Sequence, residues 1–193
     1  MKYNFYKNTF LLFILFLLMV SCCYKGLYSK NGVCRRKIND YKYKNSTIDN
    51  IDTLAVYKEQ INFAKNSITK EYVYFEKIDD NSYPYVSYLK FYSNNKVGIF
   101  NIAKSDTLKL TREHFDPSKA SMGYYLIEGN KVKMKFSIVF QCSHQILREK
   151  GTINKDSITA LQSLTALQSG YSGTIYVKRD IPKTYLENWK PDW

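Results

Sequence analysis

Residues 131–140 have the sequence KVKMKFSIVF, in which apolar and polar side chains alternate. Val132, Met134 and Phe136 fall on one face of an extended chain, and the lysines between them fall on the other. A period of two is typical of a half-buried antiparallel strand, because successive side chains point to opposite faces of a sheet. This stretch predicts a β-sheet protein with one face toward a core and one toward water.

Neighbouring segments show the same character and are separated by short turns. The turns are Ser93-Asn94-Asn95, Glu128-Gly129-Asn130, Lys150-Gly151 and Asn154-Lys155-Asp156, which contain residues that tolerate a positive φ. The predicted strands are residues 71–78, 83–92, 96–102, 107–111, 122–128, 131–141, 144–150, 153–160 and 173–179. We therefore predict an all-β fold, an antiparallel meander that closes into a barrel or half-barrel and so removes its exposed edges.

Two short helical pieces complete the predicted fold. Apolar residues recur at helical spacing after Asp52, which predicts a short N-terminal helix; they are Leu54, Tyr57, Ile61, Ala64 and Ile68. Near the other end, Pro182 favours a helical turn that would pack Leu186 and Trp189 beneath the barrel.

Residues 88–98, YLKFYSNNKVG, and residues 122–134, MGYYLIEGNKVKM, resemble small uncharacterised bacterial lipoproteins with a lipocalin-like β-barrel domain. The resemblance covers roughly residues 83–178 and implies a lipocalin-like barrel. With the aromatic content of the chain, such a barrel is expected to hold an apolar or cell-envelope ligand in its mouth. The alternative is a structural or protein-interaction module of the cell envelope with a filled barrel.

The N-terminus has the layout of a signal peptide. Lys2 and Lys7 precede an apolar run at residues 10–20, which is shorter than the roughly 20 residues that a membrane-spanning helix needs. Residues 18–22, LMVSC, resemble the lipobox of bacterial lipoproteins. The resemblance implies lipidation of Cys22 with acyl chains such as palmitate. A retained single-pass anchor and cleavage before Cys23 are the alternatives.

We therefore predict a signal peptide at 1–21, a lipidated basic tether at 22–51 and a single β-barrel-like domain at 52–193. The residues directly after Cys22 are not acidic, and by the same resemblance this implies an outer membrane, on its periplasmic side. Residues 24–45 contribute half of the net charge of +12 and would lie near the lipid, where basic residues favour anionic surfaces. The remaining domain is only mildly basic, so we predict no nucleic-acid partner.

The other cysteines carry two open interpretations. A disulfide between Cys34 and Cys142 would join the tether to the barrel, while all three cysteines other than Cys22 could also remain free. Cys142 and His144 would share one face of a strand, but Cys142 continues the apolar face of residues 132–140 and is expected to be a buried core residue.

The sequence predicts no enzyme, no cofactor and no metal site. The chain has two histidines, His114 and His144, which are too few for an ordinary zinc site, and it lacks the short motifs of hydrolases and nucleotide-binding proteins.

Replacement of Cys22 tests the anchor. Cys22→Ser removes the thiol that would accept the diacylglycerol, so unacylated and uncleaved precursor should accumulate, as measured by metabolic labelling with radioactive palmitate and by mass. Cys23→Ser is the matched control and should still be labelled. Normal labelling of the Cys22 variant would refute the assignment.

Overall fold

The computed structural model describes residues 26–36, 51–66, 68–75, 83–140, 142–163 and 171–193. Its strands are β1 (Val56–Lys65), β2 (Tyr72–Phe75), β3 (Tyr85–Phe91), β4 (Lys96–Ala103), β5 (Ser121–Glu128), β6 (Lys131–Phe140), β7 (Ser143–Asn154), β8 (Ser157–Ser163) and β9 (Tyr171–Arg179). Its 3-10 helices are η1 (Lys104–Asp106), η2 (Arg112–Phe115), η3 (Pro117–Lys119) and η4 (Lys183–Tyr185). The all-β meander is thus confirmed, as is the C-terminal helical turn.

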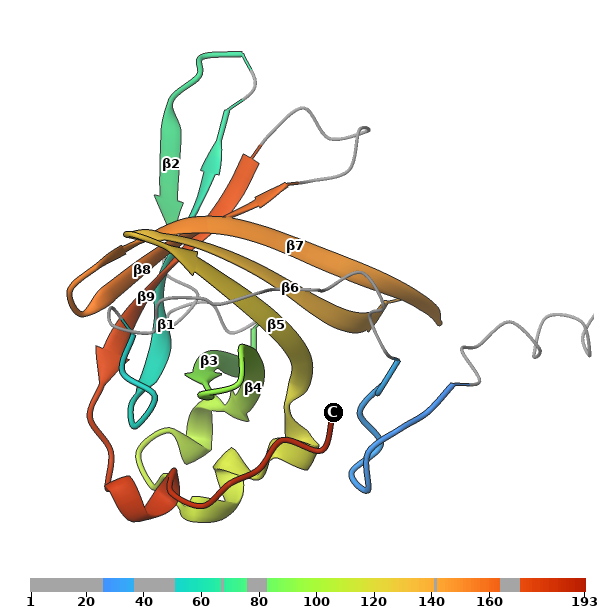
Figure 1. Ribbon diagram of the computed structural model, residues 1–193. Helices are drawn as coiled ribbons and strands as arrows, with labels where there is room; N and C mark the ends of the chain where they lie inside the picture. The colour runs from blue at the N-terminus through green and yellow to red at the C-terminus, as the bar shows by residue number, and fades with distance from the viewer. Residues whose placement is uncertain (1–25, 37–50, 67, 76–82, 141, 164–170) are drawn as a thin grey trace, which may run out of the picture.

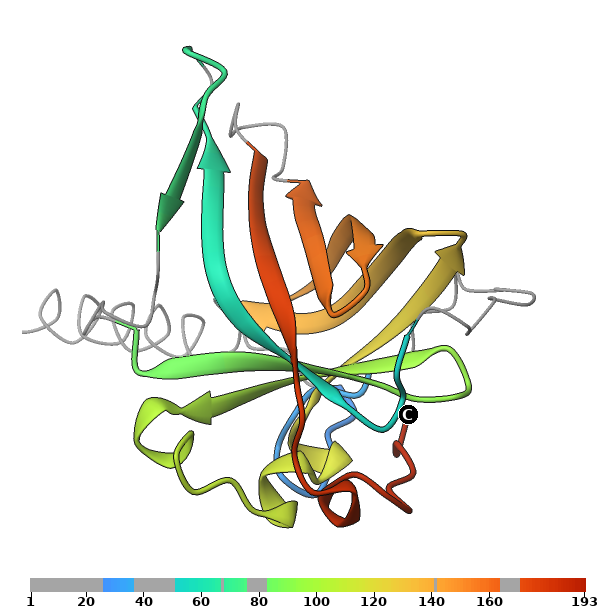
Figure 2. The same ribbon diagram turned by 90° about the vertical axis from the view of Figure 1, so that its left-hand side faces the viewer.

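Pairing of the first strand with the last closes the sheet into a barrel. β1 pairs with β9 from Val56 opposite Arg179 to Ala64 opposite Ser172. Only Tyr57 and Lys58 of β1 pair with β3, and the far end of β1 pairs with β2 instead. Eight strands therefore form the ring, and β2 extends β1 as an arm beyond it. The arm projects from one end of the barrel. The N-terminal hairpin (residues 27–35), the 3-10 segment (residues 104–119) and the C-terminal segment (residues 180–193) lie at the opposite end (Figures 1 and 2).

The described residues form two apolar clusters, one inside the barrel and one on its outer wall. The interior cluster includes Tyr57, Leu89, Phe91, Tyr125, Phe136 and Tyr176. The outer cluster includes Val56, Tyr88, Phe100, Phe115 and Leu186, so the 3-10 segment and the C-terminal segment cover the outer face of β3 and β4. Each fully buried side chain of this kind stabilises the fold by about 1.5–3 kcal/mol.

The predicted N-terminal helix is wrong, because this segment forms β1. The register shifts between Glu59 and Ile61, which marks a β-bulge at Gln60. A bulge interrupts the period of two, and Tyr57 and Ile61 therefore lie on opposite faces of β1. β1 also buries both faces, with Tyr57 in the interior cluster and Val56 in the outer one.

Two predicted boundaries are also wrong. Residues 107–111 lie between η1 and η2 rather than in a strand. Lys150-Gly151 is not a turn, because β7 continues to Asn154. Gly151 is needed inside this strand, since a Cβ there would lie 2.2 Å from the carbonyl oxygen of Thr159. The other three predicted turns contain Asn95, Gly129 and Lys155, each with a positive φ.

Candidate functional site

A buried lysine lies on the outer face of β3. Leu89 and Phe91 point into the barrel, so Lys90 between them points outward, where the C-terminal segment covers it. The Lys90 side chain is only 3% exposed. Its ammonium donates hydrogen bonds to the carbonyl oxygens of Thr53 and of Phe91, the latter at 3.3 Å.

This position changes the chemistry of the amine. Burial lowers the pKa of Lys90 to about 8, although the nearby Asp52 carboxylate opposes the shift. An ammonium group has three donors, and two of them bond to backbone carbonyls, so one donor is left for another acceptor. The Lys90 ammonium also lies 5.3 Å from the centre of the Tyr92 ring.

Lys90 lines an open pocket of about 670 Å³, which we call the Lys90 pocket. One wall is formed by residues 53–54, just before β1, and a second by residues 90–94, from the end of β3 and the β3–β4 turn. Residues 186–191 of the C-terminal segment form the third wall. Leu54, Leu186 and Trp189 supply apolar surface, and Lys190 supplies a second amine. The hydroxyl of Tyr92 is buried without a hydrogen bond to any described residue. The volume lies within the roughly 300–1,000 Å³ of small-molecule sites.

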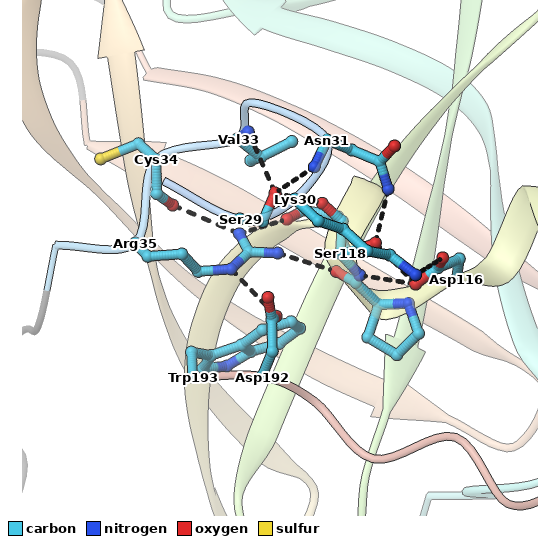
Figure 3. A network of polar contacts seen from close by, with 12 residues as sticks. Ser29, Lys30, Asn31, Val33, Cys34, Arg35, Asp116, Ser118, Asp192 and Trp193 are labelled. Atoms are coloured by element: carbon cyan, nitrogen blue, oxygen red, sulfur yellow. Dashed lines mark hydrogen bonds and ion pairs between the residues drawn. The ribbon is translucent and has the colours of Figure 1, made fainter. Parts of the chain in front are cut away.

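Arg35 fixes the C-terminal segment that forms one wall of this pocket. The N-terminal hairpin, residues 27–35, bends back so that Tyr28 bridges Cys34, and Figure 3 shows Arg35 pointing from it toward the C-terminus. The Arg35 guanidinium donates to Asp192 at 3.0 Å and to the carbonyl oxygens of Ala120 and Pro117, each at 2.9 Å. It also lies 5.0 Å from the centre of the Trp193 ring.

Further contacts hold the same hairpin on the 3-10 segment. Ser29 Oγ donates to the carbonyl oxygen of Ser118 at 2.6 Å, and Lys30 forms an ion pair of 2.9 Å with Asp116 (Figure 3). Residues 26–36 therefore pack on the barrel, although they fall within the range expected to be a tether. Residues 22–25 and 37–50 of that range lie outside the described residues.

Neither open interpretation of the remaining cysteines holds, because Cys34 and Cys142 do not bond to each other and Cys142 is not free. Cys34 is a buried free thiol, and Cys142 is disulfide-bonded, so its bond is not to Cys34. Cys142 is also exposed, with a φ of 62°, because β6 ends at Phe140 and the chain turns there. The expectation of a buried core cysteine at this position is therefore wrong. Cys22, the predicted lipidation site, lies outside the described residues.

The two histidines are placed apart. His144 Nε2 lies 2.8 Å from Ser137 Oγ, and the Arg36 guanidinium lies 3.2 Å from His144 Nδ1. Burial and then the Arg36 charge lower the pKa of His144. Ser137 is fully buried beneath the N-terminal hairpin, with Cys34 Sγ 3.8 Å from its Oγ. His114 Nδ1 accepts a hydrogen bond from the Thr111 backbone, so this histidine caps η2.

Sequence reasoning missed Lys90 and Arg35. Lys90 stands within the apolar run of residues 88–92, YLKFY, in the predicted strand 83–92, and no site was predicted there. In this run, large apolar side chains occupy both faces of the strand, and this pattern could have predicted that Lys90 is buried. Arg35 gave no local signal, because three of its four oxygen acceptors lie more than 80 residues away.

Searches of the residues that the structure describes find no cluster of three or more metal-ligating side chains. The same residues contain no helix long and apolar enough to cross a membrane. Comparison of the chain with known proteins finds no matching family model, curated protein or solved structure.

Replacement of Arg35 tests its role in fixing the pocket wall. Arg35→Ala should lower the free energy of unfolding by roughly 2–3 kcal/mol, because buried carbonyls and Asp192 lose a charged donor. Urea denaturation measures this loss, and hydrogen exchange should become faster in residues 186–193. The neighbouring, exposed Arg36 is the control, and Arg36→Ala should change stability by less than about 0.5 kcal/mol. Equal losses in both variants would contradict the assignment.

Proposed function

We propose that this protein is a lipid-anchored protein of the cell envelope that binds a small anionic ligand with an apolar part in the Lys90 pocket. Lipidation at Cys22 would attach it to a membrane, with the outer membrane and its periplasmic side favoured by the residues after that cysteine. The activity is binding, and no catalytic step is part of the proposal.

The observation that carries the ligand class is the buried ammonium of Lys90 in the pocket wall. A buried charge is costly unless it is paired, and among the described residues Lys90 contacts neutral carbonyls and the Tyr92 ring, with Asp52 nearby. An anionic group would use its remaining donor and offset the cost of burial. Leu54, Leu186 and Trp189 would pack against an apolar portion.

The barrel interior offers less support for the apolar ligand expected from the sequence. Tyr57, Phe91, Tyr125 and Phe136 are all fully buried inside the ring. The Phe91 ring contacts the rings of Tyr57 and Tyr125 edge to face, at 5.6 and 5.0 Å between ring centres. This part of the interior is therefore filled by the protein's own side chains.

Octanoate, a carboxylate with an apolar tail, is a suitable probe. Calorimetric titration at pH 7 should show binding that Lys90→Met weakens about 10- to 100-fold, the usual value of a charge-assisted hydrogen bond. Affinity of the unmodified protein should fall as pH rises through about 8, because Lys90 loses its proton there. Lys90→Arg keeps the charge at every pH used and should remove this dependence.

Lys190→Met is the matched control, because Lys190 lines the same pocket but is exposed. Its effect on octanoate affinity should be less than about threefold. Failure of octanoate to bind, or equal effects of the Lys90→Met and Lys190→Met substitutions, would refute this function.

The β2 arm favours a second candidate function, a protein-interaction module. All four residues of β2 are exposed, and Tyr74 reaches 61%. Exposed aromatic side chains grouped in this way are typical of protein interfaces.

Site-specific photocrosslinking in cells tests this second candidate. A photoreactive residue at Tyr74 should give a discrete adduct with an envelope protein. The same residue at Leu108, which is 89% exposed on the 3-10 segment, should give none. Recovery of only the uncrosslinked monomer from both positions would exclude the arm as an interface.

A further inference from the structure

Polar side chains form a second site inside the barrel, above the aromatic part of the core. In the pairing of β1 with β9, Glu59 lies opposite Tyr176. The next inward-facing pair toward the end of β1 is Asn62 opposite Thr174. One step further, Ser172 of β9 lies opposite Gln162 of β8, which in turn lies opposite Glu149 of β7. We call Glu59, Asn62, Glu149, Thr174 and Tyr176 the acidic cup.

One carboxylate of the cup is fully engaged. Glu59 Oε1 accepts a hydrogen bond from Asn62 Nδ2 at 2.6 Å, and Oε2 accepts one from the Ser87 backbone at 3.1 Å. This geometry follows from the fork in the sheet, because β1 stops pairing with β3 after Lys58 and leaves the Ser87 amide to a side chain. Thr174 Oγ1 holds the other end of Asn62 through a bond of 2.8 Å to Oδ1.

The second carboxylate is buried and incompletely satisfied. Glu149 is only 7% exposed, and its Oε2 accepts no hydrogen bond from the described residues. Burial, and then repulsion from Glu59, raise the pKa of Glu149 to about 7. Both carboxylates also raise the pKa of Tyr176, after burial itself, so the three groups share one electrostatic environment. An orphaned buried carboxylate of this kind costs stability unless a donor reaches it.

Glu149 lies between Met134 of β6 and Gln162 of β8 in the sheet. Small residues occupy nearby positions of the ring, namely Ala64, Gly151, Ala160 and Ser172. Ala64, Gln162 and Ser172 are partly exposed, so this level of the barrel is close to solvent. The aromatic rings of Tyr57, Phe91 and Tyr125 belong to the cluster below.

We propose that the acidic cup binds a protonated amine, with the ammonium group placed between Glu59 and Glu149. An ammonium group supplies donors where Glu149 Oε2 has none, and its positive charge offsets the repulsion between the two carboxylates. Thr174 and Tyr176 line the same space with hydroxyl groups. The class of ligand is a small primary alkylammonium ion, in contrast to the anion proposed for the Lys90 pocket, and the two sites are independent.

Butylammonium is the probe, and butan-1-ol is its neutral counterpart of nearly equal shape. Calorimetric titration of the full-length protein at pH 8 should show binding of butylammonium at millimolar concentration, with at least tenfold weaker binding of butan-1-ol. Glu149→Gln keeps the shape of the side chain and removes its charge, so it should weaken butylammonium binding at least tenfold. Glu128→Gln, an exposed carboxylate on β5, should leave the affinity unchanged.

A steric variant keeps the test valid if Glu149→Gln fails to fold. Ser172→Leu retains both carboxylates but places a large side chain in the cup, and it should also abolish binding. Lys90→Met should leave butylammonium affinity unchanged, which separates this proposal from the function proposed for the other pocket. Absence of butylammonium binding up to 20 mM, or equal binding by the unmodified protein and Glu149→Gln, would overturn the inference.

Discussion

The ladder between β1 and β9 is the constraint on which the rest of the structure depends. It joins Val56 to Arg179, near opposite ends of the described chain, and turns an open meander into a ring. Because the ring is closed, β1 is covered on both faces, with Tyr57 inside and Val56 against the outer cluster. Without this ladder, β1 and β9 would be open edges, and neither apolar cluster would be complete.

Both candidate sites follow from the way β1 divides between its neighbours. Beyond Lys58, β1 separates from β3 to pair with β2, and Glu59 accepts the backbone donor left at the fork. On the outer side, the residues before β1 form one wall of the Lys90 pocket, and the carbonyl oxygen of Thr53 in this wall accepts a hydrogen bond from Lys90. One strand therefore supports a cationic group outside the barrel and an anionic pair within it.

The buried charges differ in how completely the protein satisfies them. Arg35 has four oxygen acceptors and a tryptophan ring, an arrangement typical of a structural role. Lys90 has neutral carbonyl partners, and one oxygen of Glu149 accepts no hydrogen bond from the described residues. Good partners offset the desolvation cost of a buried charge, so this incomplete satisfaction is the basis on which we propose ligand binding at both residues.

Local pattern determined the meander, because alternation in residues 131–140 and turn residues such as Asn95 and Gly129 act within a few positions of themselves. The predicted lipobox at Cys22 also rests on a local pattern, and it stays a prediction. The helix predicted after Asp52 was wrong because β1 buries both faces and is interrupted by a bulge at Gln60, so its sequence shows no period of two. Burial of Lys90, Arg35 and Glu149 was decided only by tertiary structure, since the segments that cover or face each side chain come from distant parts of the chain.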